Sequence, residues 1–249
     1  MNFYGGFNHE ISLKMIINNF ISFAKKKVEA YKNYYESWKY ERKLFSSIKC
    51  GNKKYKEYLR CQLDRTLSKK QRDDAYNRVK YLLSKFVEKV NHPKDAKILS
   101  VGCRNMYEIQ AFHDMGFKNV TGIDLFSENK SILVMDMQNM TFEDNTFDVI
   151  FSCHSLEHTH DYKKAISEFV RVAKDGSVLV IEVPVNYETG GSDLWDFESL
   201  ENLKKIFQPN TGRVLFEEYL RNDAKNNFDG TDIIRIIFKI EKEDVVWIK

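Results

Sequence analysis

The stretch Lys97-Ile-Leu-Ser-Val-Gly102-Cys-Arg-Asn-Met106, which continues through Gly116 to Thr121-Gly-Ile-Asp124-Leu125, decides the fold. An apolar run of strand length ends at Gly102, a segment with apolar residues at helical spacing follows, and a second short strand ends in Asp124. These segments predict one βαβ unit. The first turn of such a unit exposes backbone N–H groups at a helix N-terminus, and an acid at the tip of the second strand can accept hydrogen bonds from a ribose diol. We therefore expect a nucleotide-like ligand.

A dinucleotide site fits this stretch poorly. The G-x-G-x-x-G fingerprint requires glycines where the chain has Arg104 and Tyr107. A lone Gly102 with a distant acid is also compatible with a tight strand-to-helix turn that binds nothing. The segments on either side of this unit must therefore decide the function.

Upstream of the unit, residues 1–93 read as mostly helix. Apolar residues recur at helical spacing near both ends of this region, and Pro93 is its only proline. The stretch Asn91–Asp95 gives the one clear break, because the residue before a proline disfavours continued helix. We predict a helical N-terminal subdomain, residues 1–93, and a second domain, residues 94–249.

Basic and aromatic residues are interleaved between Lys25 and Lys56. The aromatic residues interleaved with the basic ones include Tyr31, Tyr34, Tyr35, Trp38 and Tyr40. This pattern could stack and clamp a nucleic acid or an anionic substrate. By base rate we favour the alternative, a solvated lysine face whose tyrosines pack on the main domain.

Downstream, strand-like and helix-like segments alternate, which predicts a mainly parallel sheet with helices on both faces. The five expected strands are Lys97–Val101, Asn119–Asp124, Ile132–Met135, Phe147–Cys153 and Ser177–Val183. A core-facing helical stripe at Ile166, Phe169, Val170 and Ala173 separates the last two. Only Leu125–Lys130 joins the second and third strands, so a crossover helix there must be short or absent. Ser199 is a plausible N-cap for a helix at Leu200–Phe207, and two more strands are expected at Val214–Tyr219 and Ile233–Ile240.

Composition excludes several classes of protein. The 249 residues are 43% hydrophobic and 30% charged with a formal net charge of +3, which suits a globular domain and implies no strongly charged partner. No apolar run resembles a signal peptide or reaches the roughly 20 residues of a membrane span, so we expect a cytoplasmic protein. The cysteines, which include Cys103 and Cys153, form no C-x-x-C pair, so we expect reduced thiols and neither a zinc cage nor a disulfide framework.

Three later segments give the chain a family resemblance. They are Val134-Met-Asp136-Met137, the run from Phe142 to His158 that ends in Ser155-Leu-Glu157-His158, and Gly176–Pro184. In this order they resemble the class I S-adenosylmethionine-dependent methyltransferases, closely over residues 94–184 and loosely to about 240. The resemblance implies a Rossmann-like, mostly parallel seven-stranded sheet whose last two strands form an antiparallel hairpin.

The resemblance also implies S-adenosylmethionine as the cofactor. It assigns the methionyl part to the backbone around Gly102, the ribose hydroxyls to Asp124, and the adenine to Asp136 and Met137. The complete implied set of cofactor-binding residues is Gly102, Arg104, Asp124, Leu125, Asp136, Met137 and Cys153. As alternatives, Asp124 could merely cap the following turn and Met137 could belong to the core.

Two residues depart from the family pattern. Ser100 replaces the usual strand-one acid, and Arg104 replaces the second glycine of the loop. Arg104 must swing away from the cofactor or pair with its carboxylate by a charge-assisted hydrogen bond. The second possibility is a hypothesis that Arg104→Ala tests.

Histidines at the end of the fourth expected strand are candidates for proton transfer. An acceptor hydroxyl must lose its proton as the methyl group is transferred, and a histidine can take it near neutral pH. We predict His158 as the general base, with His154 second, and a backbone-bonded structural histidine as the alternative. A metal held by His154, His158, His160 and Glu157 ranks well below this role, so no metal site is predicted.

The acceptor is expected to meet the N-terminal helices and the loop Asn186–Phe197, where Trp195 could stack on a sugar or pack against a helix. We predict O-methylation of a small polar acceptor, such as a sugar, a phosphorylated glycan precursor or a nucleotide-linked sugar. Nucleic-acid modification is disfavoured because base-methylation motifs are missing. The rivals are an RNA methyltransferase that grips RNA with the basic helices, and a binding or scaffold protein that lost the cofactor.

Overall fold

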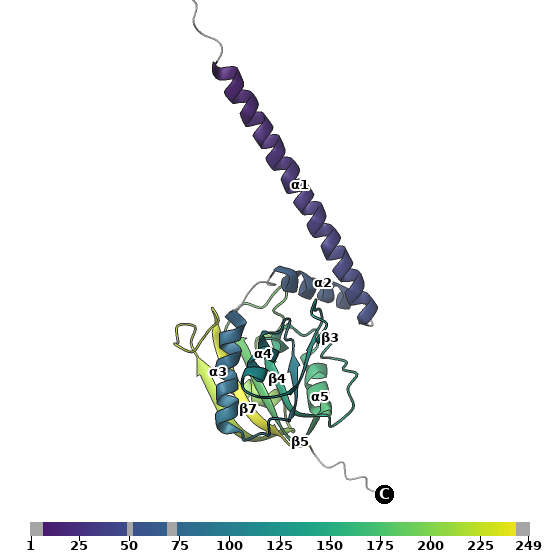
Figure 1. The fold of residues 1–249 in the computed structure, drawn as a ribbon. Helices are drawn as coiled ribbons and strands as arrows, with labels where there is room; N and C mark the ends of the chain where they lie inside the picture. The colour runs from purple at the N-terminus through teal and green to yellow at the C-terminus, as the bar shows by residue number, and fades with distance from the viewer. Residues whose placement is uncertain (1–6, 49–51, 69–73, 243–249) are drawn as a thin grey trace, which may run out of the picture. The chain divides into compact units, whose positions relative to one another are not determined.

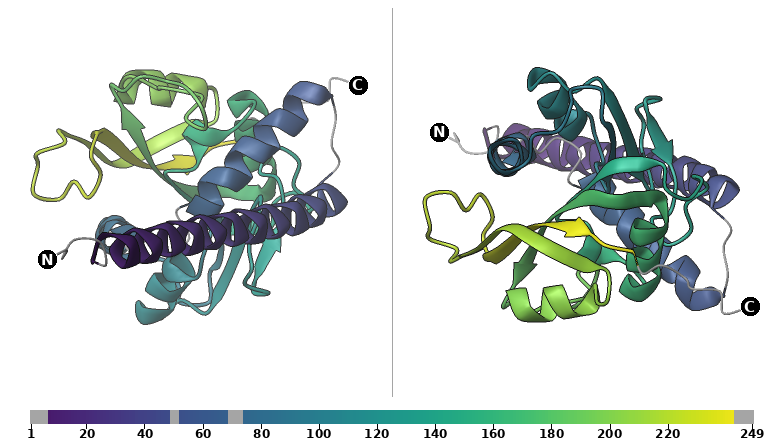
Figure 2. Two further views of the ribbon diagram at one scale, coloured as in Figure 1. Left: turned by 90° about the horizontal axis from the view of Figure 1, so that it is seen from above. Right: turned by 90° about the horizontal axis from the view of Figure 1, so that it is seen from below.

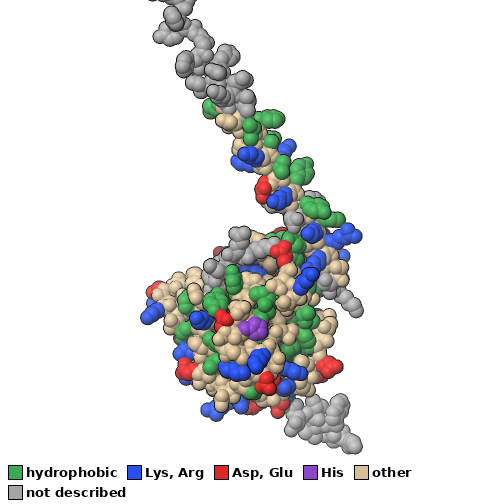
Figure 3. Space-filling model, in the orientation of Figure 1, with side chains coloured by type: hydrophobic (Ala, Val, Ile, Leu, Met, Phe, Trp, Pro, Cys, Tyr) green, Lys and Arg blue, Asp and Glu red, His purple; other side chains and the backbone are tan. Residues whose placement is uncertain are grey.

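The computed structural model describes residues 7–48, 52–68 and 74–242. It contains two compact units, Met1–Lys43 and Leu44–Lys249. The first unit consists of most of the helix α1 (Phe7–Ser47; Figure 1), and Figure 3 shows both basic and apolar side chains along its described part. On this helix the exposed aromatic side chains include those of Tyr31, Tyr35 and Trp38. The side chain of Tyr34 is not among those that the structure describes.

The second unit begins with two more helices, α2 (Lys53–Ser68) and α3 (Asp74–Lys89). The prediction of a helical N-terminal region is therefore confirmed, while the subdomain boundary at residue 93 stays a prediction. No helix in the described part of the chain is long and apolar enough to cross a membrane. Cys61, Cys103 and Cys153 are free thiols, as expected, and Cys50 lies outside the described residues.

The sheet has seven strands in the order β3-β2-β1-β4-β5-β7-β6. Their bounds are β1 Lys97–Val101, β2 Asn119–Asp124, β3 Ile132–Val134, β4 Phe147–Cys153, β5 Ala173–Val185, β6 Thr211–Leu220 and β7 Asp232–Ile240. Strands β1 to β5 are parallel, and β7 runs antiparallel to both of its neighbours. The seven-stranded Rossmann-like prediction and its final hairpin are confirmed.

One boundary differs from the expected one. Helix α5 (Tyr162–Val172) ends at Val172, and Ala173 opens β5 instead of completing the helical stripe. Ala173 is fully buried because it pairs with Phe147 of β4. The apolar spacing alone could not distinguish these two environments for a small residue.

The connections match the sequence analysis elsewhere. The segment between β2 and β3 contains turns and bends and no helix, so the expected crossover helix is absent. Ser199 caps α6 (Leu200–Ile206), because its side chain accepts a hydrogen bond from the Asn202 backbone N–H.

Two apolar clusters hold the layers together on opposite faces of the sheet (Figure 2). One includes Phe169 of α5 and Leu203 of α6, and the other includes Phe86 of α3 and Phe112 of α4 (Tyr107–Asp114). All four side chains are fully buried. Helix α3 is therefore one of the layers that cover the sheet.

The sequential order of the strands runs outward in opposite directions from β1 and β4. The carboxyl ends of β1, β2, β4 and β5 lie at the same edge of the sheet. Ligands of open α/β sheets bind at such a switch point. Helix α2 lies along this edge, since its Gln62 donates hydrogen bonds to the backbone oxygens of His158 and Ser192 (Figure 1).

Candidate functional site

The turn after β1 requires glycine at position 102. Gly102 has φ +76°, in the left-handed region that L side chains rarely adopt. A Cβ atom there would also lie 2.3 Å from the Cβ of Ser155, which follows β4. The turn is closed by hydrogen bonds from the Gly102 and Cys103 backbone N–H groups to the Ile123 oxygen, at 2.8 and 3.2 Å. Gly102 thus brings the ends of β1, β2 and β4 together.

Asp124 ends β2 and faces this turn. Its Oδ2 accepts a hydrogen bond from the Arg104 backbone N–H at 2.8 Å, and its Oδ1 accepts one from the Phe126 N–H at 3.0 Å. Burial raises the pKa of Asp124, against the opposing effect of these amides and of the Arg104 guanidinium. Each carboxylate oxygen keeps a second lone pair, so the carboxylate can still accept two hydroxyl donors of a ribose. Asp124 therefore caps the following turn, as in the alternative interpretation, and can still bind a ribose.

Arg104, the residue at the unusual loop position, has φ +47°. Its side chain lines a pocket of about 330 Å³ with Thr66 of α2, Tyr107 and Phe126. Leu125, which precedes Phe126, is half-buried. This placement puts a cation beside Asp124 at the mouth of the β1 turn.

The sequence analysis missed Glu108. The Ser100 hydroxyl, at the position of the missing strand-one acid, donates a hydrogen bond to Glu108 Oε2 in the first turn of α4. Glu108 is buried, and burial raises its pKa to about 7. A carboxyl group therefore lies beneath the loop after all, but α4 supplies it. The sequence signal that could have identified Glu108 is an acidic residue among the apolar residues on the buried face of α4.

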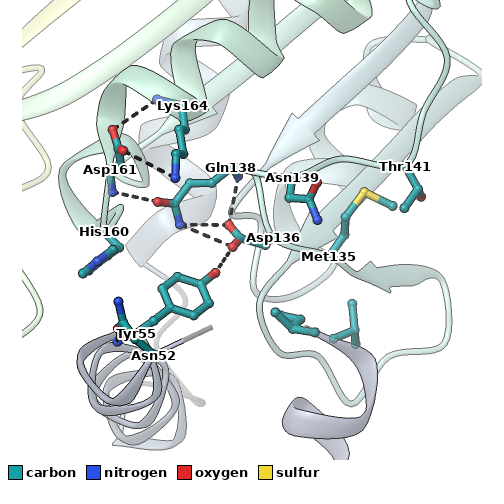
Figure 4. A pocket seen from close by; sticks show the side chains of 12 residues that line it. Asn52, Tyr55, Met135, Asp136, Gln138, Asn139, Thr141, His160, Asp161 and Lys164 are labelled. Atoms are coloured by element: carbon teal, nitrogen blue, oxygen red, sulfur yellow. Dashed lines mark hydrogen bonds and ion pairs between the residues drawn. The ribbon is translucent and has the colours of Figure 1, made fainter. Parts of the chain in front are cut away.

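Asp136 follows β3 and lies at the wall of a pocket of about 540 Å³ (Figure 4). Its Oδ1 accepts hydrogen bonds from the Gln138 backbone N–H and Nε2, at 2.9 and 3.0 Å, and its Oδ2 accepts one from the Tyr55 hydroxyl of α2. Burial raises the pKa of Asp136. His160 lines the same pocket, with its ring 5.4 Å from the Tyr55 ring.

Met137 and Cys153 are placed less favourably for the roles that the resemblance implies. Met137 is half-buried and packs against the cluster that includes Phe169. Cys153 is buried, and its Sγ lies 3.6 Å from Glu182 Oε1 of β5. Burial raises the pKa of the Cys153 thiol well above its usual range. Cofactor contacts by these two side chains stay predictions.

His158 closes the short 3-10 helix η1 (Leu156–His158) beside the carboxyl end of β4. Its Nδ1 lies 3.1 Å from Asp193 Oδ1 and 3.1 Å from the Ser192 backbone oxygen. Arg65 of α2 donates to both oxygens of Asp193, at 2.8 and 2.7 Å. Burial raises the pKa of Asp193, but the hydrogen bonds from His158 and Arg65 outweigh it and hold that pKa well below its usual range.

His154 directly follows β4 with φ +51°. Its Nε2 lies 2.9 Å from Glu182 Oε1, and its Nδ1 lies 3.7 Å from Asp229 Oδ2 and 3.8 Å from Glu157 Oε1. Glu157 lies between the two histidines, because its Oε1 is also 3.4 Å from His158 Nε2. The structure therefore brings together His154, Glu157 and His158, while His160 lines the pocket beside Asp136.

Trp195 adopts the packing alternative. Its indole Nε1 donates a hydrogen bond to the Thr159 oxygen at 2.7 Å, and its ring meets Tyr162 edge-on at 4.7 Å. Within the described residues, no group of three His, Cys, Asp or Glu side chains is arranged to hold a metal ion.

Helix α2 supplies contacts that the sequence analysis expected only in general terms. Tyr55 reaches Asp136, Gln62 reaches the backbone of His158, and Arg65 reaches Asp193. Tyr58 is buried between them, and burial raises its pKa. The site is thus covered by a helix whose polar side chains touch both its β3 end and its β4 end.

Residues 99–181 match the family described as "Methyltransferase domain". The chain is 25% identical over 144 residues to the sterol 4-C-methyltransferase strm-1 of Caenorhabditis elegans, which covers 51% of this chain and 41% of that protein. It is 37% identical over 60 residues to ajmaline N-methyltransferase of Rauvolfia serpentina, covering 24% of this chain and 21% of that protein. The chain thus matches less than half the length of either relative.

Solved structures share the fold. The Burkholderia thailandensis 1,6-didemethyltoxoflavin-N1-methyltransferase, which was solved with its substrate and S-adenosylhomocysteine, superposes with a TM-score of 0.59 at 13% identity. The superposition covers 78% of this chain and 92% of that one. The matched segment contains β1 to β4, the Gly102 turn, Asp124 and Asp136, which are the elements of the site described above. Residues 99–181 therefore match a methyltransferase domain, and the chain shares the fold of the solved methyltransferase.

Proposed function

We propose that the protein binds S-adenosylmethionine at the carboxyl ends of β1 to β3 and methylates a small polar acceptor held beside His158. The observation that carries this proposal is the joint placement of the Gly102 turn, Asp124 and Asp136 at the carboxyl ends of the neighbouring strands β1, β2 and β3. Both are carboxylates with lone pairs to spare, and they supply the hydrogen-bond acceptors that a ribose diol and an adenine amine need. When bound, the cofactor supplies an activated methyl group on a positively charged sulfur.

The chain's own residues perform the remaining tasks. Gly102 allows the backbone to approach a ligand at the β1 turn, because a side chain there would collide with Ser155. Asp124 orients the ribose and Asp136 orients the base. Methyl transfer then depends on holding the acceptor atom in line with the methyl group, and burial of this edge under α2 excludes water.

His158 remains the proposed general base. Asp193 accepts a hydrogen bond from His158 Nδ1, which leaves Nε2 with the lone pair that can take a proton. Arg65 in turn fixes Asp193, so the imidazole is oriented from two elements distant in sequence. This arrangement of base and orienting carboxylate is the one expected for proton transfer at neutral pH.

The acceptor predicted from sequence, a hydroxyl of a sugar or phosphorylated glycan precursor, remains a proposal. The side chains around His158 give a phosphate little support, because Arg65 is already paired with Asp193 and the neighbouring Glu157 is acidic. An RNA acceptor has one observation in its favour, which is the exposure of Tyr31, Tyr35 and Trp38 among the lysines of α1.

The test is transfer of isotope-labelled methyl groups from S-adenosylmethionine into a cell extract separated into small molecules, RNA and protein. We expect label in the small-molecule fraction, with His158→Gln reducing it and Lys163→Gln, a change in an exposed residue, leaving it unchanged. Label confined to RNA would establish the rival acceptor. No transfer with any fraction would contradict the enzymatic proposal and favour the scaffold alternative.

A further inference from the structure

Glu157 has a buried carboxylate whose hydrogen-bonding capacity is unused. The residue is 1% exposed, yet neither of its side-chain oxygens accepts a hydrogen bond. Buried polar groups are hydrogen-bonded in the great majority of cases, so an unsatisfied carboxylate requires an explanation. Its backbone oxygen, by contrast, accepts from the Leu194 and Trp195 N–H groups, which fixes the residue in place.

The neighbouring carboxylates are all paired with arginines. Glu182 pairs with Arg235, and Asp193 pairs with Arg65. Asp229 lies 3.5 Å from an Arg78 nitrogen. Among the described residues, Glu157 alone of these four acids has no arginine or lysine within ion-pair distance, and its only close nitrogens belong to histidines. The cluster therefore carries one negative charge more than its arginines balance.

His158 presents a lone pair, rather than a proton, to Glu157 when it is neutral. His158 Nδ1 lies within 3.1 Å of two oxygens, so it carries the proton and Nε2 is left as an acceptor 3.4 Å from Glu157 Oε1. His154 Nδ1 faces Glu157 Oε1 at 3.8 Å and Asp229 Oδ2 at 3.7 Å, while its Nε2 lies 2.9 Å from Glu182 Oε1 without forming a hydrogen bond, so its tautomer is left open. The His158 tautomer is assigned from its hydrogen-bonding distances. The two Glu157 oxygens and His158 Nε2 are thus three neighbouring acceptors without a donor.

Building on the proposed function, we propose that these acceptors bind a protonated amine of the acceptor molecule and that the enzyme is an N-methyltransferase. An ammonium group offers three N–H donors and a positive charge, which match the two Glu157 oxygens and the His158 lone pair. A hydroxyl offers one donor and would leave the other acceptors unsatisfied. The surplus negative charge also disfavours a phosphate.

The chemical step balances with the groups present. The ammonium gives one proton to His158 Nε2, which leaves a neutral amine with a free electron pair. That pair forms the new C–N bond to the methyl carbon while the C–S bond electrons return to sulfur and neutralise the sulfonium. The methylated product carries the positive charge, and Glu157 stabilises it as it did the incoming ammonium.

The first test is nitrogen NMR of the histidine rings in the wild-type protein at pH 7.5. We expect His158 as the neutral tautomer protonated on Nδ1. An imidazolium at His158 or at His154 would satisfy Glu157 internally and overturn the proposal.

The second test follows the same signals during titration with matched pairs of compounds: benzylamine and benzyl alcohol, tryptamine and tryptophol, and glucosamine and glucose. We expect the amines to bind and shift the ring signals, and Glu157→Gln to weaken that binding about 10- to 100-fold, the typical worth of a hydrogen bond to a charged group. Glu188→Gln, which removes an exposed carboxylate of the adjacent loop, is the matched control and should have no effect. Alcohols binding as well as amines, or neither class binding, would overturn the proposal.

Titration of the same samples with S-adenosylmethionine separates this inference from the function on which it rests. Wild type and Glu157→Gln should bind the cofactor with affinities within about twofold, because Asp124 and Asp136 are unchanged in both. Normal cofactor binding without amine selectivity would refute the amine alone. Failure of the wild type to bind the cofactor would refute the proposed function.

Discussion

Glu108 offers a quantitative prediction, because its pKa is raised from the usual 4.5 to about 7 by burial beneath the β1 turn. Between these values the folded chain binds more protons at this position than the unfolded chain does. Glu108 therefore lowers the stability of the folded state progressively as pH rises through this window. This destabilisation by Glu108 is absent below pH 4.5 and complete above pH 7.

The size of the effect follows from the shift. A displacement from 4.5 to about 7, at 1.36 kcal/mol per pKa unit, corresponds to about 3 kcal/mol in total, of which roughly 2.5 kcal/mol develops between pH 5 and pH 8. Glu108→Gln removes the titration while keeping an oxygen that can accept the Ser100 hydrogen bond. The variant should therefore gain about 2.5 kcal/mol over wild type between pH 5 and pH 8.

Urea unfolding at both pH values, monitored by circular dichroism, measures this difference, and contributions from all other groups cancel between the two proteins. Glu143→Gln, which alters an exposed carboxylate, should show no such pH-dependent gain. A stability difference between Glu108→Gln and wild type that is constant across this range would refute the reasoning. It would mean that Glu108 is already ionised at pH 5 in the folded protein.

Three further changes test other parts of the site. Gly102→Ala should destabilise the fold by more than about 2 kcal/mol in thermal unfolding, since it combines a positive φ with a Cβ 2.3 Å from that of Ser155, and Ser155→Gly should recover part of the loss. Tyr55→Phe should tighten cofactor binding about fivefold, worth about 1 kcal/mol, because it frees an oxygen of Asp136; unchanged affinity would show that the hydroxyl does not compete. His158→Gln should lower turnover about 10²- to 10⁴-fold near neutral pH, and wild-type turnover would remove His158 as the base.

The sheet could be predicted because its strands are short apolar runs whose ends carry turn residues. The positions of Asp124 and Asp136 followed from the same pattern, since residues after successive parallel strands meet at one edge of the sheet. The Gly102 turn was identified for the same reason. These features depend on local sequence and on one rule of topology.

The parts that escaped prediction depend on contacts between distant segments. Arg65 and Asp193 are 128 residues apart, and no local pattern indicates that they meet beside His158. Tyr55 lies 81 residues before Asp136, so the basic helical region gave no sign that one of its tyrosines contacts the predicted adenine-binding acid. Glu108 was missed because its role arises from packing against Ser100 of β1 and is not visible in the spacing of the loop glycines.

Calorimetric titration with S-adenosylmethionine and S-adenosylhomocysteine tests the central claim most directly. We predict binding in the micromolar range, about −8 kcal/mol, for wild type and for Asp223→Ala, an exposed control, and its loss in Asp124→Ala. Equal binding by wild type and Asp124→Ala, or no binding of either ligand to wild type, would contradict the assignment of a cofactor site at the carboxyl ends of β1 to β3.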